Sequence, residues 1–158
     1  MANTTYLKKT VEPYLLEWTS KQISMPLVKK QVVVGKDSAG RPVSFEFDGM
    51  SEDGTVGVCI SASTSYKTGQ MRKFFMEAAL LNRAPQFQRR IMVFVEPQMW
   101  ESFRKQCDGL VDLGNIEALI CTELPRQMRA GIAEVYAASA REVGDKSGRG
   151  TRVPRRRT

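Results

Sequence analysis

The sequence predicts an α/β protein in which a mixed central sheet is flanked by helices. Three observations predict this class: helical spacing of apolar residues at both ends of the chain, three successive strand-like stretches, and two later apolar runs separated by a helix. The 158 residues are 42% hydrophobic, which is enough for one domain with a single core. The expected order of elements is αβββαβαβα.

The first helix is predicted over residues 5–24. Apolar side chains recur there at the three- and four-residue spacing of one helix face, and only Pro13 interrupts the pattern. The residues of this face are Tyr6, Leu7, Val11, Tyr14, Leu15, Trp18 and Ile23. We therefore expect one amphipathic helix.

Three strands are predicted next, over residues 27–34, 42–48 and 55–62. The segments that separate them, 36–40 and 50–54, combine Asp, Ser and Gly and are typical of turns. Such short connections join neighbouring strands in opposite directions. We therefore expect an antiparallel meander.

Polar residues line one side of the second and third strands. Because strand side chains alternate between the two faces, residues two apart share a face. These residues are Ser44, Glu46 and Asp48 on the second strand, and Gly57, Cys59 and Ser61 on the third. A candidate site lies on these polar faces.

Helices and short apolar strands alternate in the rest of the chain. Helices are predicted over 68–83, 97–107 and 126–141, and strands over 90–96 and 116–121. The dense apolar run 90–96 is expected to be a central strand that is buried on both faces. In the helix over 68–83, we expect Arg72, Lys73 and Glu77 on the more exposed side.

The composition excludes several classes of site. Histidine is absent, which excludes Ser-His-Asp and Cys-His nucleophilic catalysis, HExxH zinc proteases and the His-containing zinc finger. The three cysteines, Cys59, Cys107 and Cys121, form no CxxC pair and are expected to be buried and unreactive. There is no signal-peptide core and no apolar run of about 20 residues, so we expect a cytoplasmic protein without a membrane partner.

Positive charge is concentrated at the C-terminus. The formal net charge is +7, but residues 141–158 carry seven Lys or Arg against Glu142 and Asp145. Subtracting this excess of five leaves only +2 for residues 1–140, so the body of the chain is nearly neutral. We expect residues 1–143 to form one α/β domain and residues 144–158 to be a basic tail that is disordered in isolation.

The second and third predicted strands also carry an Asp at a suggestive spacing. The chain reads Phe45-Glu-Phe-Asp48, then the turn Gly-Met-Ser-Glu-Asp-Gly, then Val58-Cys-Ile-Ser61. With the preceding helix, the meander and the elements after it, this stretch resembles the core of the restriction-endonuclease-like, or PD-(D/E)xK, nucleases. In that family an Asp near the end of the second strand is followed by (D/E)xK in the third. The resemblance implies a restriction-endonuclease-like core, with Asp48 in the first position.

The chain departs from the family pattern at the other two positions. Cys59 stands where the family has its second acid, and Ser61 stands where it has its lysine. The resemblance implies two carboxylates that hold Mg²⁺ or Mn²⁺ and a lysine that positions or activates water. A neutral thiol and a hydroxyl replace neither group, and Mg²⁺ prefers oxygen ligands to sulfur. The standard motif is therefore expected to be degenerate.

Other residues could supply the missing groups, because members of the family sometimes carry a catalytic charge at a neighbouring position or on a helix. Glu46 is a candidate second carboxylate and metal ligand beside Asp48, and Lys67 or Lys73 is a candidate lysine. The candidates from the first helix are Glu12 and Glu17. Each of these has an alternative interpretation as a solvated surface residue, and Asp48 has one as a turn residue.

Contacts with nucleic acid are predicted at two places. Lys29 and Lys30, near the start of the first strand, could contact phosphate or could instead protect an edge strand from aggregation. The tail could neutralise phosphates or could simply be a solvated basic end. Its candidate contact residues are Arg149, Arg152, Arg155, Arg156 and Arg157.

Three functional hypotheses follow. The first is a catalytically inactive restriction-endonuclease-like domain that binds DNA, RNA or a protein partner in a nucleic-acid-handling system and needs no cofactor. The second is an active nuclease with migrated catalytic residues, dependent on Mg²⁺ or Mn²⁺. The third is a protein-interaction or assembly module, including a homo-oligomer, with no nucleic-acid role.

Overall fold

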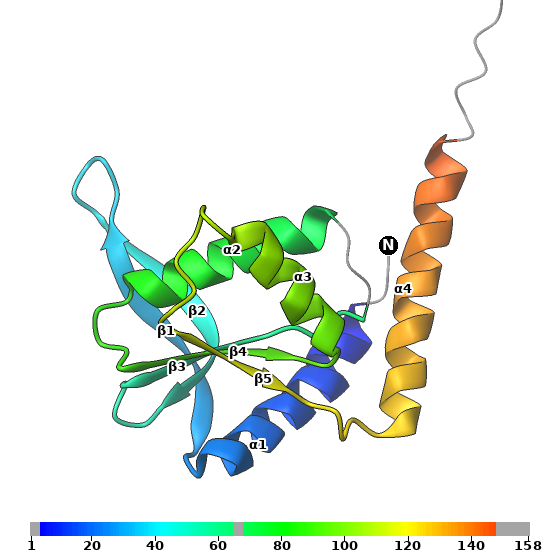
Figure 1. Cartoon of the computed structure of the whole chain (residues 1–158), viewed down its shortest axis with the longest axis horizontal. Helices are drawn as coiled ribbons and strands as arrows, with labels where there is room; N and C mark the ends of the chain where they lie inside the picture. The colour runs from blue at the N-terminus through cyan, green and yellow to red at the C-terminus, as the bar shows by residue number, and fades with distance from the viewer. Residues whose placement is uncertain (1–3, 65–67, 148–158) are drawn as a thin grey trace, which may run out of the picture.

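A computed structural model describes residues 4–64 and 68–147 and contains a five-stranded mixed sheet (Figure 1). The strands are β1 (Leu27–Lys36), β2 (Pro42–Ser51), β3 (Val56–Ile60), β4 (Arg89–Phe94) and β5 (Ile116–Ile120), in that spatial order. The first three are antiparallel, and β3, β4 and β5 are parallel. The α/β class, the meander and the order of elements are confirmed.

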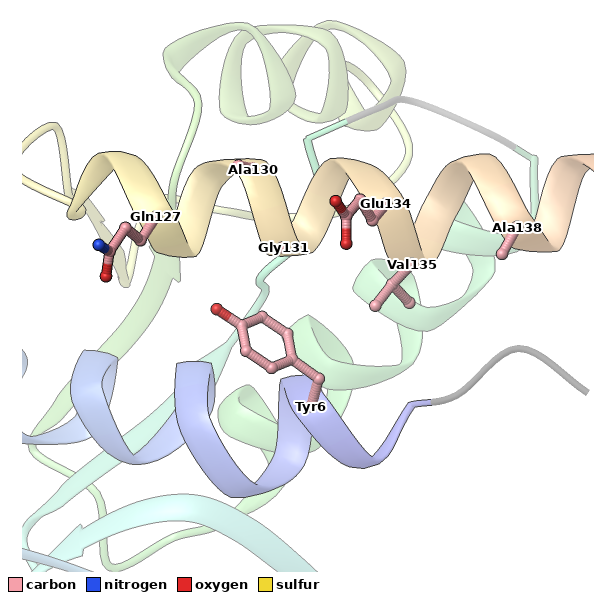
Figure 2. Close-up of a pocket in the computed structure, with 7 residues that line it drawn as sticks. All are labelled: Tyr6, Gln127, Ala130, Gly131, Glu134, Val135 and Ala138. Carbon is pink, nitrogen blue, oxygen red and sulfur yellow. The ribbon is translucent and has the colours of Figure 1, made fainter.

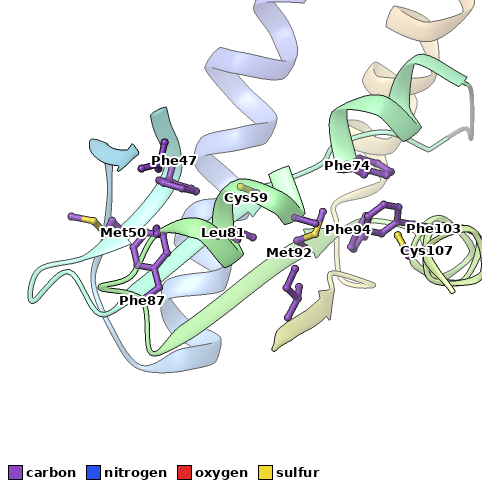
Figure 3. Packing of buried hydrophobic residues seen from close by; sticks show 14 of the residues in the cluster. Phe47, Met50, Cys59, Phe74, Leu81, Phe87, Met92, Phe94, Phe103 and Cys107 are labelled. Atoms are coloured by element: carbon purple, nitrogen blue, oxygen red, sulfur yellow. The ribbon is translucent and has the colours of Figure 1, made fainter. Parts of the chain in front are cut away.

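Helices cover both faces of the sheet. On one face lie α2 (Thr68–Arg83) and α3 (Pro97–Cys107), and against the other lie α1 (Glu12–Ile23) and α4 (Arg126–Ser147) (Figure 1). Each face has its own apolar cluster: Figure 3 shows the rings of Phe74, Phe94 and Phe103 packed on the α2 side. Side chains of β3 and β4 divide between the two clusters, which explains their nearly continuous apolar sequences.

The first predicted helix begins as a π-helical segment, η1 (Leu7–Val11), and continues as α1. Pro13 has no backbone N–H to donate, so the regular hydrogen-bonding pattern cannot pass through it. The N–H of Glu12 instead donates to the carbonyl oxygen of Leu7, five residues earlier. This wider turn lies where Glu12 projects from the helix.

The last helix is longer than the sequence predicts. It continues to Ser147, so its final turn includes the first residues of the predicted tail, while residues 148–158 lie outside the described part of the chain. Ile132 of this helix is fully buried, and Met128 and Tyr136 are partly buried against the apolar cluster on the α1 side. These residues attach α4 to the face of the sheet that α1 covers.

One expectation for α2 is wrong. Glu77 was expected on the exposed side of this helix, but only 4% of the residue is exposed. Phe74 and Leu81, on the same helix, are fully buried against the sheet. The turn between them carries Glu77 and is buried as well. Helical periodicity alone could not detect a carboxyl group on the buried face.

Gly57 tests the close packing of β3. A Cβ atom at this position would lie 2.2 Å from Cε2 of the buried Phe87 ring. We expect Gly57→Ala to lower the free energy of unfolding by about 1–3 kcal/mol, because the ring must move within a filled core. Chemical denaturation measures the effect. Gly69→Ala on α2, where a Cβ would meet nothing within 4 Å, is the control and should not destabilise the protein.

Candidate functional site

A β-bulge sets the direction of the Asp48 side chain. Val28 pairs with Met50 and Lys30 pairs with Phe47, so two residues of β2, Asp48 and Gly49, lie opposite one residue of β1. The extra residue breaks the alternation of β2, and Phe47 and Met50, three residues apart, both reach the apolar cluster under α2. Strict alternation, which would place Asp48 on one face with Glu46, therefore does not hold at Asp48.

The carboxyl group of Asp48 accepts a hydrogen bond from β3 beyond the point where the backbone pairing of β2 and β3 ends. The last paired residues before the strands separate are Gly49 and Val58. Farther along β3, the backbone N–H of Ile60 donates to Oδ2 of Asp48, with a nitrogen–oxygen distance of 2.7 Å. This bond fixes the carboxyl group at the carboxyl end of β3 and leaves its second oxygen for other partners.

Three side chains with metal-binding atoms meet at this point. The carboxyl groups of Asp48 and Glu77 and the thiol of Cys59 each have a ligand atom within 4.8 Å of the others. We call these residues the Asp48–Cys59–Glu77 cluster. It is the one group of three such residues found within residues 4–64 and 68–147. It joins β2, β3 and α2.

Lys73 and Glu77, one turn apart on α2, bring opposite charges to the cluster. Nζ of Lys73 lies 3.6 Å from Oε1 of Glu77, and half of the Lys73 side chain is exposed. The other oxygen of Glu77, Oε2, is buried and has no hydrogen-bond partner in the described part of the protein. Burying a carboxylate oxygen without a hydrogen-bond partner lowers the free energy of unfolding, so such an oxygen in a folded protein indicates a functional role or an absent ligand.

Glu12 lies beside the cluster at the start of α1. It lines two adjacent hollows, one of about 220 Å³ with Asp48, Lys29 and Ile60, and one of about 250 Å³ with Lys73 and Ser61. Lys8 lines both hollows as well. A solvent-accessible cleft therefore brings three acids and three lysines together near the carboxyl end of β3. The acids are Glu12, Asp48 and the adjoining Glu77, and the lysines are Lys8, Lys29 and Lys73.

Burial and mutual repulsion raise the pKa values of the acids. Burial is the largest cause for Glu77, whose pKa rises to about 7 although the ammonium group of Lys73 opposes the shift. Burial also raises the pKa of Asp48, against the hydrogen bond from Ile60, and that of Glu12, with a further increase from the charge of Asp48. Ionising all three acids is therefore unfavourable in the folded protein, chiefly because they are buried.

The same acids also raise the pKa values of Lys73 and Cys59. Burial lowers the pKa of Lys73, but the carboxylates of Glu77, Asp48 and Glu12 raise it by more, so the ammonium form is favoured. Burial, with Glu77 and Asp48, raises the pKa of the Cys59 thiol well above its ordinary value. Cys59 is therefore a neutral thiol in the metal-free protein.

The structure brings some of the predicted site residues together and not others. Lys73 and Glu12 lie beside Asp48. Glu46 is half exposed, pairs with Lys29 at 3.5 Å and is not part of the Asp48–Cys59–Glu77 cluster, although its charge contributes to the raised pKa of Asp48. Glu17 is 71% exposed and pairs with Lys21. Lys67 lies outside the described residues. Sequence analysis missed Glu77 as a site residue; its position four residues after Lys73 was the available signal.

The predicted nucleic-acid contacts are only partly described. Lys29 and Lys30 are exposed on β1, which is an edge strand, and Lys29 also lines the hollow that contains Asp48. The arginines predicted to contact nucleic acid all follow residue 148 and lie outside the described part of the chain. Of the predicted contact residues that the structure describes, Lys29 is therefore the one that borders the hollow with Asp48 and Glu12.

A larger hollow, of about 630 Å³, lies elsewhere, between Tyr6 and α4. Figure 2 shows the Tyr6 ring facing α4 at Gly131, with Ala130, Val135 and Ala138 along the same helix. Among the described residues that line it, most are small and apolar, and Glu134 is the only ionisable one besides Tyr6. The group of acids and lysines therefore lies in the cleft at Asp48 and not in this hollow.

No protein-family model matches this chain, and no curated protein or solved structure was found that is similar to it. Among the helices of the described residues, none combines the length and the apolar character needed to cross a membrane. The proposals below therefore depend on the geometry of this chain alone.

The raised pKa of Glu77 predicts how stability changes with pH. In the unfolded chain this group titrates near 4.5, and in the folded protein at about 7. Between these values the folded state binds more protons, so the free energy of unfolding falls as the pH rises through this window and then levels off. Glu77→Gln should remove this loss and stabilise the protein by roughly 2 kcal/mol at about pH 8, but much less at about pH 5.

Denaturant titrations at the two pH values measure this difference. Glu101→Gln, at an exposed residue of α3 that pairs with Arg104, is the matched control and should change little at either pH. Equal effects of Glu77→Gln at both pH values would contradict the assignment of a buried, proton-binding carboxyl group.

Proposed function

We propose that this protein is a metal-dependent phosphodiesterase of nucleic acids, with a restriction-endonuclease-like core whose second acid and lysine are supplied by α2. One observation carries the proposal: Glu77 and Lys73, on a helix, lie at Asp48, where the third strand offers only Cys59 and Ser61. Of the three hypotheses drawn from the sequence, this favours the nuclease with migrated catalytic residues.

The residues at the site fit a divalent cation. Among the described residues, the buried oxygen Oε2 of Glu77 has no hydrogen-bond partner. The Glu77 carboxyl group has a ligand atom within 4.8 Å of one of Asp48. Two such carboxylates repel each other, and a cation between them would remove both the repulsion and the unsatisfied acceptor. Asp48 and Glu77 would hold the ion, and Glu12 borders the same cleft.

Each group has a distinct role in this proposal. A bound divalent cation would polarise the phosphodiester and lower the pKa of a bound water. Lys73, kept protonated by the surrounding carboxylates, offers its ammonium group to the charge that develops on the phosphate oxygens. The carboxyl group of Glu12, whose pKa is raised, lies in the cleft and can accept a proton from water.

The charges around the cleft support a nucleic-acid substrate. Lys8 and Lys29 border the hollow that contains Asp48 and Glu12, so a phosphate approaching the acids passes between two ammonium groups. Such contacts with the backbone position a nucleic acid without reading its sequence. The substrate class is therefore a phosphodiester chain, and DNA and RNA are separate arms of the test.

Cleavage assays with the full chain test this proposal. Single- and double-stranded DNA and RNA are incubated with Mg²⁺, Mn²⁺, Zn²⁺ or a chelator. We expect cleavage that depends on the cation and falls by at least about 100-fold in Asp48→Ala, Lys73→Met and Glu77→Gln, because each removes a charge that acts on the reacting phosphate or its cation.

Two exposed pairs provide matched controls. Lys21→Met removes a lysine from a Lys–Glu pair with the same four-residue spacing on α1, and Glu101→Gln removes a glutamate from an exposed pair on α3. Both variants should cleave nucleic acid at the rate of the wild type. Absence of cutting under every condition would reject the proposal and favour the hypothesis of an inactive nucleic-acid-binding domain.

A further inference from the structure

Cys59 differs from the other cysteines in what surrounds its sulfur. All three free cysteines, Cys59, Cys107 and Cys121, are buried. Within the described residues, only Cys59 belongs to a group of three side chains with ligand atoms, two of them carboxyl groups within 4.8 Å. A cysteine that served only to fill the core would have no need of two carboxyl groups beside its sulfur.

The donor set of the cluster is therefore two oxygens and one sulfur. Thiolate is a poor ligand for Mg²⁺, which prefers oxygen and keeps its water molecules, and a good ligand for Zn²⁺ and similar cations. Three protein ligands and one open position are also the arrangement found in catalytic zinc sites. Cys59 thus changes which cation the site can bind best.

We propose that Cys59 is the third metal ligand of this site and that the Asp48–Cys59–Glu77 cluster selects a thiophilic divalent cation of the Zn²⁺ class over Mg²⁺. The inference rests on the proposed function for its use of Asp48 and Glu77 as ligands, and adds the identity of the cation.

Charge balance supports this assignment. Two carboxylates and a thiolate carry three negative charges, and a divalent cation with the ammonium group of Lys73 carries three positive charges. The cation would also give Glu77 Oε2 the partner that it lacks. A coordinating cation deprotonates a thiol, so the neutral state of Cys59 in the metal-free protein does not prevent binding.

Titration of the metal-free full chain with Co²⁺ tests the inference without an activity assay. Co²⁺ accepts the same ligands as Zn²⁺, and a cobalt–thiolate bond gives a charge-transfer absorption band in the near ultraviolet. We expect this band in the wild type, its loss on addition of Zn²⁺, and its persistence in excess Mg²⁺. Absence of the band in the wild type would overturn the inference.

Variants at two cysteines locate the ligand. Cys59→Ser and Cys59→Ala should abolish the band and weaken Co²⁺ binding by more than about tenfold, since even loss of a group that supports a ligand costs about 10–100-fold. Cys107→Ser, at an equally buried cysteine of α3, is the matched control and should keep the band. A band that survives in both Cys59 variants would overturn the inference. Circular dichroism identifies any variant that fails to fold.

Cys59→Asp separates this inference from the proposed function. It restores an all-oxygen donor set, so the variant should lose the cobalt–thiolate band and bind Mg²⁺ more tightly than the wild type does. Cleavage by the wild type that is supported as well by Mg²⁺ as by Zn²⁺, with no thiolate band, would reject the role of Cys59 and leave the phosphodiesterase proposal intact. A thiolate band in the wild type, without cleavage in the presence of any cation, would reject the phosphodiesterase proposal and leave the role of Cys59 as a metal ligand intact.

Discussion

The carboxyl group of Glu77, buried beside that of Asp48, is the constraint on which the rest of the site depends. Burial and the nearby charge of Asp48 raise the pKa of Glu77, and one oxygen of Glu77 has no hydrogen-bond partner in the described structure. Isolated buried carboxylates are destabilising unless they are protonated, paired or bound to a cation. Lys73 supplies one positive charge, and the proposed metal supplies the others.

The fold meets this constraint with local irregularities. The bulge at Asp48 turns its carboxyl group away from the solvated face of β2 and toward β3, where the Ile60 N–H holds it. The π-helical turn before Pro13 lies where Glu12 enters the same cleft. The regular part of the sheet, buried under α2, is then a rigid support for groups that come from four different elements.

Much of the fold could be predicted from the sequence, because periodicity, turn residues and buried apolar runs act locally. The site could be predicted only in part. The sequence indicates Asp48, Lys73 and Glu12 as candidates. It also indicates Glu46, because strict strand alternation places it on one face with Asp48, and helical periodicity places Glu77 on the exposed side of its helix. Neither a bulge nor the burial of one carboxyl group leaves a clear signal in a single sequence, since both depend on contacts between distant elements.

The most direct test of the account moves the second carboxyl group from residue 77 on α2 to residue 59 on β3. Cleavage is measured for the wild type, for Glu77→Gln and for the double variant Cys59→Asp/Glu77→Gln, each shown to be folded, with Mg²⁺ and with Zn²⁺. The account predicts that the single variant is inactive and that the double variant regains cleavage with Mg²⁺, because the ligand atoms of residues 59 and 77 lie within 4.8 Å of each other. Undiminished cleavage by Glu77→Gln would contradict the claim that α2 supplies the missing acid.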